Sequence, residues 1–173
     1  MEYSLSGVNR LDTEPDLGEP WLSGQPLKFT PPMPIRFHID KNSHGQIMRA
    51  IYNGAYPLYR DDVLETLQRA GVLNLELFDV EIINESEDKI YANYKAVNIL
   101  GLIQCACTDS ENDETFDISM EGLSIDEEKA GGALFFRLAE NISAVVVHEK
   151  VVDAFESSNI PGIEFYDPEM WSG

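Results

Sequence analysis

The sequence predicts an α+β fold, a mostly antiparallel sheet with two or three short helices and a proline-rich extended N-terminal arm. One observation is the alternation of apolar and acidic residues at 75–83, which is followed by a polar stretch and then by β-forming residues. Another is that helical spacing of apolar residues is confined to two short segments, 62–70 and 148–158. The length of 173 residues fits one domain.

The first 34 residues differ in composition from the rest of the chain. Six of the nine prolines lie between Pro15 and Pro34. Proline has a fixed φ and no amide hydrogen, so this stretch is neither a helix nor a central strand. Trp21, Leu22 and Phe29 are large apolar side chains, which a free tail seldom carries. We therefore expect residues 1–34 to form an arm packed on the body, and residues 35–173 to form a single α+β domain.

The first elements of the body are a strand, a turn and a helix. Residues 35–39 alternate in the manner of a strand, and the composition of 40–45 is that of a turn. A helix is expected to begin at Asp61 or Asp62, and with Asp62 as N-cap Glu65 falls at the third helical position and completes a capping box. Gly71 is the expected C′ residue.

The remaining elements follow from alternation and β-propensity. Residues 75–83 and 90–107 are expected to be two strands of an antiparallel hairpin that turns at 84–88, the second bent or interrupted at Gly101. Residues 133–138 and 143–147 read as apolar strands, residues 148–158 as a helix, and residues 163–165 as a final short strand.

The charge excludes some classes of partner. Thirty-one acidic residues against twelve basic ones give a net charge of −19 and a pI of about 4.3. Nucleic acid and anionic membranes need Lys and Arg to meet their phosphates, so neither is an expected partner. Acidity can serve solubility alone, but it also accelerates encounter with a basic protein. The oligomeric state does not follow from these observations.

The acidic residues are concentrated in two stretches. Between 109 and 128 there are nine acids and no base, although a sequence selected for stability alone would intersperse lysines. In the second stretch, Glu76, Asp79 and Glu81 are expected to share the polar face of one strand. Such surfaces suit a partner rich in Lys and Arg. The candidate binding residues are Asp109, Glu111, Asp113, Glu114, Asp117, Glu121, Glu85, Glu87 and Asp88.

The sequence offers little catalytic or metal-binding chemistry. His38, His44 and His148 have no metal-ligand spacing. His38 and Asp40 would share a strand face as a conceivable acid–base pair, which leaves a small enzyme as one alternative. Neither a nucleophile elbow nor a phosphate-binding loop is found. We predict no catalytic residue, no metal and no cofactor.

Two further patterns also fail as metal sites. Residues 109–120 resemble a calcium loop in their alternating acids, but Glu114 replaces the required glycine and Met120 the bidentate glutamate. Cys105 and Cys107 are expected on one face of a strand, as small half-buried thiols in a reducing compartment.

The first ten residues lack the features of a signal peptide, and the apolar runs are too short to span a bilayer. We expect a cytoplasmic protein.

Several short segments together resemble a known family. They are Pro57-Leu58-Tyr59-Arg60, Leu75-Glu76-Leu77-Phe78, Tyr94-Lys95-Ala96-Val97-Asn98-Ile99-Leu100-Gly101-Leu102, Leu134-Phe135-Phe136-Arg137-Leu138, Val147-His148-Glu149-Lys150-Val151-Val152-Asp153-Ala154-Phe155 and Gly162-Ile163-Glu164-Phe165. Over about residues 57–166 the chain is similar to the immunity-eleven family, bacterial proteins encoded beside polymorphic toxins.

The resemblance implies a cytoplasmic immunity protein that binds and neutralises a cognate toxin. It carries over no catalytic residue. It implies that Asn98 satisfies backbone groups inside a strand and that Arg137 pairs with a carboxylate. A nuclease toxin needs a basic cleft for phosphates, and an acidic inhibitor can occupy that cleft as a nucleic-acid mimic. The alternative from another class is an acidic DNA-mimic regulator that binds a host protein, and gene neighbourhood would separate the two.

Overall fold

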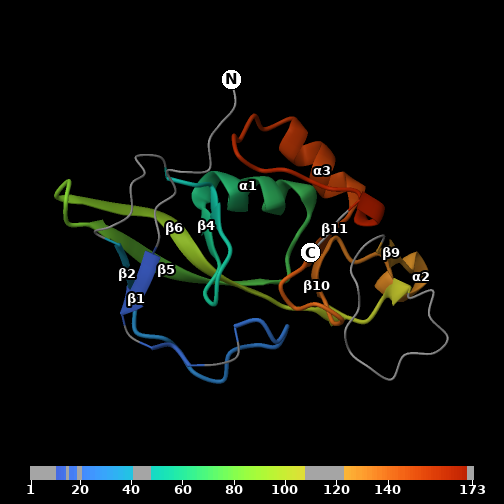
Figure 1. Cartoon of the computed structure of the whole chain (residues 1–173), viewed down its shortest axis with the longest axis horizontal. Helices are drawn as coiled ribbons and strands as arrows, with labels where there is room; N and C mark the ends of the chain where they lie inside the picture. The colour runs from blue at the N-terminus through green and yellow to red at the C-terminus, as the bar shows by residue number, and fades with distance from the viewer. Residues whose placement is uncertain (1–10, 15, 19–20, 41–47, 108–122, 171–173) are drawn as a thin grey trace.

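The computed structural model describes residues 11–14, 16–18, 21–40, 48–107 and 123–170, and over these the fold is α+β and mostly antiparallel (Figure 1). The main sheet has six strands in the order β1-β2-β5-β6-β4-β3, in which only β2 and β5 pair in parallel. Its strands are β1 (Leu11–Glu14), β2 (Ile35–Ile39), β3 (Ile51–Tyr52), β4 (Leu58–Arg60), β5 (Leu75–Asn84) and β6 (Lys89–Ile99). The predicted fold class is confirmed.

The β5–β6 hairpin is the framework of this sheet. Its ladder runs from Leu75 opposite Ile99 to Asn84 opposite Lys89, with a register shift between Val80 and Ile82. Successive side chains point to opposite faces of the sheet, so alternation divides the hairpin residues between two cores. The predicted hairpin and its turn at 84–88 are therefore confirmed.

Two helices cover one face of the sheet. The helices α1 (Asp61–Ala70) and α3 (Glu149–Glu156) pack against each other, and Val63, Leu67 and Val151 are fully buried between them and the strands. Burying an apolar side chain of this size contributes about 1.5–3 kcal/mol. Figure 1 shows both helices on the same side of the β5–β6 hairpin.

The helix α1 begins at Asp61, one of the two expected starts, but its N-cap differs from the prediction. The residue before the helix is Arg60, which makes no side-chain capping bond, and the expected capping box from Asp62 to Glu65 is wrong. The Asp62 carboxylate instead accepts hydrogen bonds from Nε and Nη2 of Arg60, at 2.8 and 2.7 Å. This ion pair competes with capping of the helix. That guanidinium holds the pKa of Asp62 below its ordinary value. The helix ends as predicted, with Gly71 at φ 96°.

The described part of the arm lies against the other face of the sheet. Trp21 is 2% exposed and packs edge-on against Tyr56 and Phe78, at ring-centroid distances of 5.7 and 5.2 Å. Gly24 accepts a backbone bond from Gly101, and its φ of +70° and its closeness to that loop require glycine. The division of the chain at residue 34 stays a prediction.

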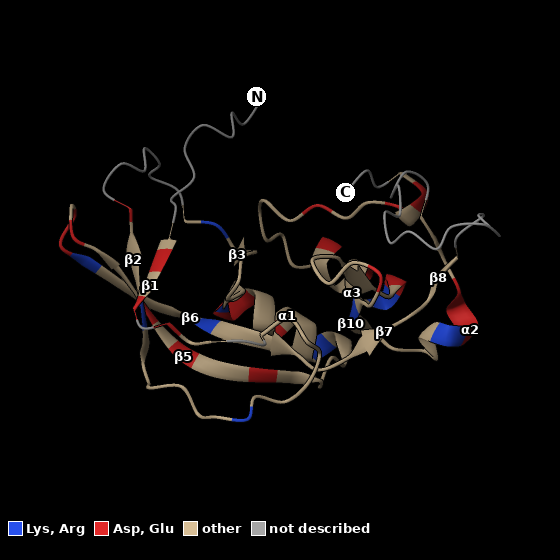
Figure 2. Ribbon diagram, turned by 60° about the horizontal axis from the view of Figure 1, so that its bottom comes forward, with Lys and Arg blue, Asp and Glu red and all other residues tan. Residues whose placement is uncertain are grey.

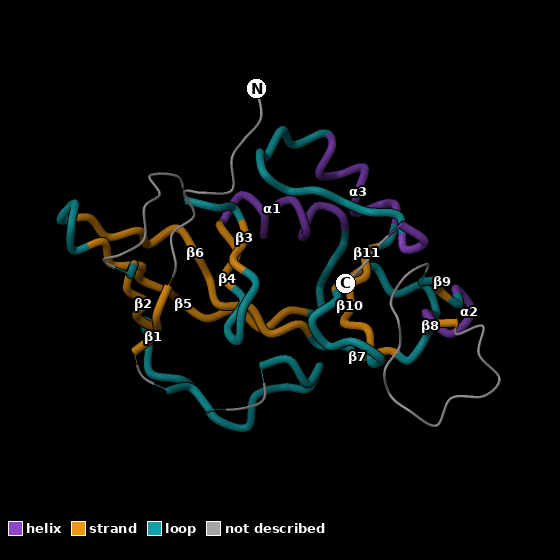
Figure 3. Tube along the Cα trace, viewed as in Figure 1, coloured by secondary structure: helices purple, strands orange, loops and turns teal. Residues whose placement is uncertain are grey.

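A second sheet extends the molecule beyond the hairpin. It has the order β11-β10-β7, built from β7 (Leu102–Ile103), β10 (Phe135–Leu138) and β11 (Val145–Val147). The chain continues into a small ribbon of β8 (Ala106–Cys107) with β9 (Ser124–Ile125), followed by α2 (Glu127–Ala130), and it closes with the 3₁₀ turn η1 (Pro168–Met170). Figure 3 shows these short elements gathered at the end of the molecule opposite the hairpin tip.

One local prediction is confirmed in this region and two are corrected. Residues 90–107 contain the long strand β6, which ends at Ile99, and the interruption expected at Gly101 separates it from β7 and β8. Residues 163–165 are a loop, since the segment pairs with no described strand. Cys105 is buried outside a strand whereas Cys107 is exposed, so the two thiols do not share a face. Burial raises the pKa of Cys105, which keeps this thiol protonated.

Candidate functional site

The candidate binding residues fall into two groups in the structure. The residues Asp109, Glu111, Asp113, Glu114, Asp117 and Glu121 lie outside the described residues, so their arrangement stays a prediction. Glu85, Glu87 and Asp88 are described, and all three are exposed at the tip of the β5–β6 hairpin. Figure 2 shows this tip coloured red at one end of the molecule.

The hairpin tip is held by local hydrogen bonds. Ser86 Oγ donates to Asn84 Oδ1 at 2.7 Å, and the Glu87 amide donates to the Asn84 carbonyl at 3.3 Å. Asp88 has a φ of 50°, a left-handed conformation that Asp adopts more readily than most residues. The neighbouring cation Lys89 lies over the ring of Tyr91, 4.3 Å from its centroid. The carboxylates thus project from a turn whose backbone is fixed.

One histidine joins the tip to the neighbouring strands. His38 Nε2 lies 2.8 Å from Glu14 Oε1, and its Nδ1 lies 3.6 Å from Glu85 Oε1. Both ring nitrogens therefore face carboxylates, one from β1 and one from the hairpin turn. The conceivable acid–base pair of His38 with Asp40 stays untested.

The expected acidic face of β5 is not free. Asp79 pairs with Lys95 at 2.8 Å, and Glu81 pairs with Arg36 at 3.3 Å. Glu76 points to the arm, where its Oε2 accepts from the Leu27 amide and from Asn98 Nδ2. These carboxylates serve the fold itself, so the prediction of a shared acidic face on this strand is wrong.

The two residues singled out by the resemblance are both buried. Asn98 Nδ2 also donates to the Gln25 carbonyl at 2.8 Å, so it satisfies a backbone group as expected. Arg137 is 3% exposed and donates from Nη1 to the Ile142 carbonyl at 2.8 Å. It makes no ion pair within the described part of the chain, so the expected carboxylate partner is not found there. Burial lowers the pKa of its guanidinium.

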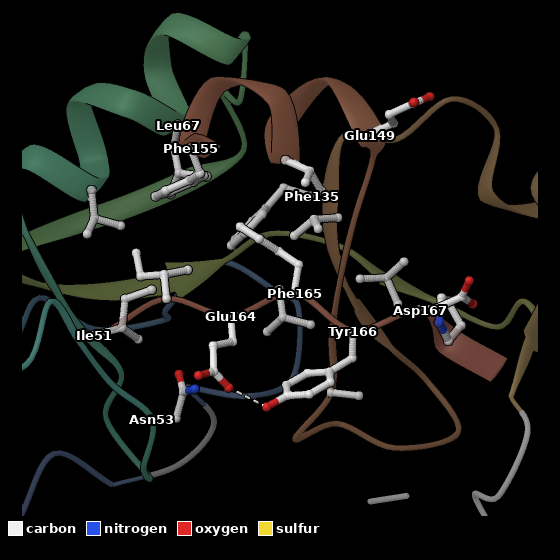
Figure 4. Close-up of a pocket in the computed structure, with 18 of the residues that line it drawn as sticks. Ile51, Asn53, Leu67, Phe135, Glu149, Phe155, Glu164, Phe165, Tyr166 and Asp167 are labelled. Atoms are coloured by element: carbon white, nitrogen blue, oxygen red, sulfur yellow. Dashed lines mark hydrogen bonds between the residues drawn. The ribbon is translucent and has the colours of Figure 1, made fainter. Parts of the chain in front are cut away.

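The described structure contains a cavity of about 600 Å³. It lies between α1, the β10–β11 pair, α3 and the segment 163–168 (Figure 4). Its walls are mostly apolar, and they include Leu67, Phe135, Phe155 and Phe165. Phe155 and Phe165 are in contact, with ring centroids 5.6 Å apart. This volume falls within the range of ordinary ligand and peptide pockets.

The polar side chains that line the cavity are neutral or acidic. Tyr59 lies on its wall, and burial raises the pKa of this phenol to about 12. Glu149, Glu164 and Asp167 are exposed at its margin. None of the described residues that line it is a lysine, arginine or histidine. The cavity therefore combines an apolar interior with a negative rim.

Sequence reasoning missed this cavity. Its lining comes from residues between 51 and 168, and pattern analysis treats such segments one at a time. Two apolar runs, 143–147 and 163–165, were the available signal for a cavity. A predicted strand that does not pair with another strand leaves its apolar surface uncovered. The pairing that would have covered it does not occur within the described chain.

Comparison with known proteins leaves the family open. Neither the protein-family models nor the curated proteins gave a match to this chain. In the described residues no helix is long and apolar enough to cross a membrane. Within that same part of the chain, no group of three or more His, Cys, Asp or Glu residues is arranged to hold a metal ion.

Proposed function

We propose that this chain is an immunity protein, which binds a cognate bacterial toxin in the cytoplasm through an acidic surface and neutralises it. The observation that carries the proposal is the set of exposed carboxylates at the β5–β6 tip, Glu85, Glu87 and Asp88. They project from a turn that is held by hydrogen bonds, so the backbone that carries the charges is ordered before a partner arrives. The resemblance to the immunity-eleven family supports the same function.

The distribution of charge favours recognition of a basic protein. The twelve basic residues cannot neutralise thirty-one acids, and several of them are already engaged in ion pairs within the sheet. The remaining excess raises the association rate with a positively charged partner and disfavours acidic competitors. The six candidates between 109 and 121 are proposed as a second part of the binding surface, and the strands that flank this segment, β8 and β9, lie at the end of the molecule opposite the tip.

Co-expression with the product of the adjacent upstream open reading frame tests the function. The chain is expected to co-purify with that product and to restore growth of cells that produce it. A product that is not toxic, or toxicity that the chain leaves unchanged, would remove the immunity function.

Charge variants test the surface itself. Glu85→Gln, Glu87→Gln and Asp88→Asn together keep the side-chain shapes, and Asn tolerates the left-handed backbone of position 88. At low ionic strength we expect the association rate with the toxin to fall about tenfold. Charge reversal of Asp113, Glu114 and Asp117 together should also slow association and lower protection. Glu65→Gln, on the exposed side of α1, is the matched control. Unchanged rates in both sets would exclude these residues.

A further inference from the structure

The outer edge of β11 carries backbone groups that the sheet does not use. The Leu138 amide donates to the Ala144 carbonyl, and the His148 amide donates to the Leu134 carbonyl. In an antiparallel ladder such hydrogen-bonded pairs alternate with non-hydrogen-bonded ones. Val145, opposite Arg137, and Val147, opposite Phe135, are therefore the non-bonded positions.

The N–H and C=O groups of these two valines point away from β10. The opposite strand confirms this alternation, because the Arg137 amide faces the other side and donates to Gly101 at 3.0 Å. In the described chain, β11 is the terminal strand of its sheet. Two residues of the same strand thus present two donors and two acceptors in one direction, at the spacing of an extended backbone.

The cavity lies beside this edge. Val145 and Val147 are part of its lining, together with Ser143 and Glu149 at the two ends of the strand. Their side chains join the core between the sheet and the helices, so an added strand would place every second side chain over the same apolar wall. Figure 4 shows the open space between the β10–β11 pair and the segment that carries Glu164, Phe165 and Tyr166.

We propose that this edge and its cavity bind an extended segment of a partner protein by β-strand addition. The occupant is a strand with apolar residues at alternate positions and Lys or Arg beside them. The backbone groups of Val145 and Val147 specify an extended chain, and a compact small molecule would not pair with all four. The rim carboxylates Glu149, Glu164 and Asp167 specify the cationic flanks.

The proposal deepens the proposed function, and rests on it only in taking the basic partner to be the toxin. Main-chain hydrogen bonds at β11 would supply the specific contact with the toxin, whereas the charges of the hairpin tip attract it at longer range. The site itself needs only a partner of the stated chemistry, so it can be tested without the toxin.

A displayed library of random twelve-residue peptides, selected on the full chain, provides the probe. Enriched peptides are expected to alternate apolar residues and to carry Lys or Arg. On binding, the amides of Val145 and Val147 should become protected from hydrogen exchange. Absence of enrichment, or protection confined to other residues, would overturn the proposal.

A proline variant tests the edge. Val145→Pro removes an outward amide and leaves the bonds to β10 in place, and proline is tolerated on the free side of an edge strand. Peptide affinity should fall at least tenfold while the thermal midpoint changes little. Val146→Pro is the contrasting variant, since it removes a ladder bond and should destabilise the fold. Unchanged affinity in a folded Val145→Pro protein would exclude strand addition.

Single charge reversals keep the test open if the proline variant does not fold. Glu149→Lys and Glu164→Lys should each weaken binding about three- to tenfold, whereas Glu65→Lys on α1 makes the same change in charge and should not. Equal losses of peptide affinity at all three positions would contradict a specific role of the rim carboxylates. If the chain self-associates and Val145→Pro abolishes that association, the occupant of the edge is a second copy of the chain. This result would overturn the proposed partner. Peptide binding without toxin protection would leave this site standing and remove only the immunity function.

Discussion

Replacing Trp21 by alanine tests whether the arm belongs to the cooperative fold. The indole is 2% exposed and meets the rings of Tyr56 and Phe78 edge-on. Truncation of a buried aromatic residue to alanine costs about 3–5 kcal/mol, through lost burial and the cavity that remains. For a chain of this length, each 1 kcal/mol lowers Tm by about 2–4 °C. We therefore expect Trp21→Ala to lower Tm by roughly 6–20 °C.

A conservative variant separates packing from hydrogen bonding. The buried Nε1 of Trp21 has no hydrogen-bond partner among the described groups, so Trp21→Phe gives up ring area but also removes an unsatisfied donor. We expect this variant to cost less than about 2 kcal/mol. Leu73, whose side chain is 83% exposed, is the control, and Leu73→Ala should be near neutral. The assay is urea unfolding followed by far-ultraviolet circular dichroism. A Trp21→Ala cost below about 1 kcal/mol, with an unchanged m-value, would refute the inference that this residue is part of the cooperative core.

Three further predictions concern stability. Burial raises the pKa values of Tyr59 and Tyr94 from 10.0 to about 12, so their contribution is complete below pH 10 and is lost as pH rises from 10 to 12. Of the seven tyrosines, these two should ionise only together with the change in circular dichroism, and ionisation of all seven near pH 10 in a folded protein would contradict this. Asn74 Nδ2 donates to the carbonyl of Leu100, just after β6, and to that of Phe135 in β10, at 2.6 and 2.8 Å, and Asn74→Ala should cost about 1–3 kcal/mol in urea unfolding. Gly24→Ala should destabilise by more than about 1 kcal/mol, because its φ is +70° and the new Cβ would lie 2.7 Å from another side chain. Gly54→Ala, where nothing lies within 4 Å, is the neutral comparison in the same measurement.

The parts of the fold that the sequence predicts well are those decided by local pattern. The β5–β6 hairpin follows from alternation on both sides of a polar turn, and its register places Asp79 opposite Lys95. The end of α1 follows from Gly71, because a left-handed C′ residue is a local requirement. The N-cap of α1 was predicted wrongly, since the pairing of Arg60 with Asp62 competes with the capping role that the pattern implies.

The parts that were missed depend on contacts between distant segments. The pairing of Arg36 with Glu81 requires β2 to lie parallel to β5, which no local pattern specifies. Residues 163–165 have the composition of a strand but pair with no strand among the described residues, and a strand exists only through its pairing. The candidate site divides in the same way, because the exposed tip could be placed from sequence whereas the cavity beside β11 could not.

The two proposed surfaces would act at different stages of one binding event. Charges at the hairpin tip act over about a Debye length, roughly 10 Å at 0.1 M salt, so they govern the rate of encounter and weaken as salt increases. Main-chain bonds at Val145 and Val147 form only in contact, so they would govern the rate of dissociation and depend little on salt. A toxin complex would therefore be expected to show a salt-sensitive association rate and a dissociation rate that responds to the edge of β11. The two rates would be controlled separately because the two features lie in different sheets. The charges lie on a turn that projects from the main sheet, whereas the strand edge left unpaired in the described chain belongs to the second sheet.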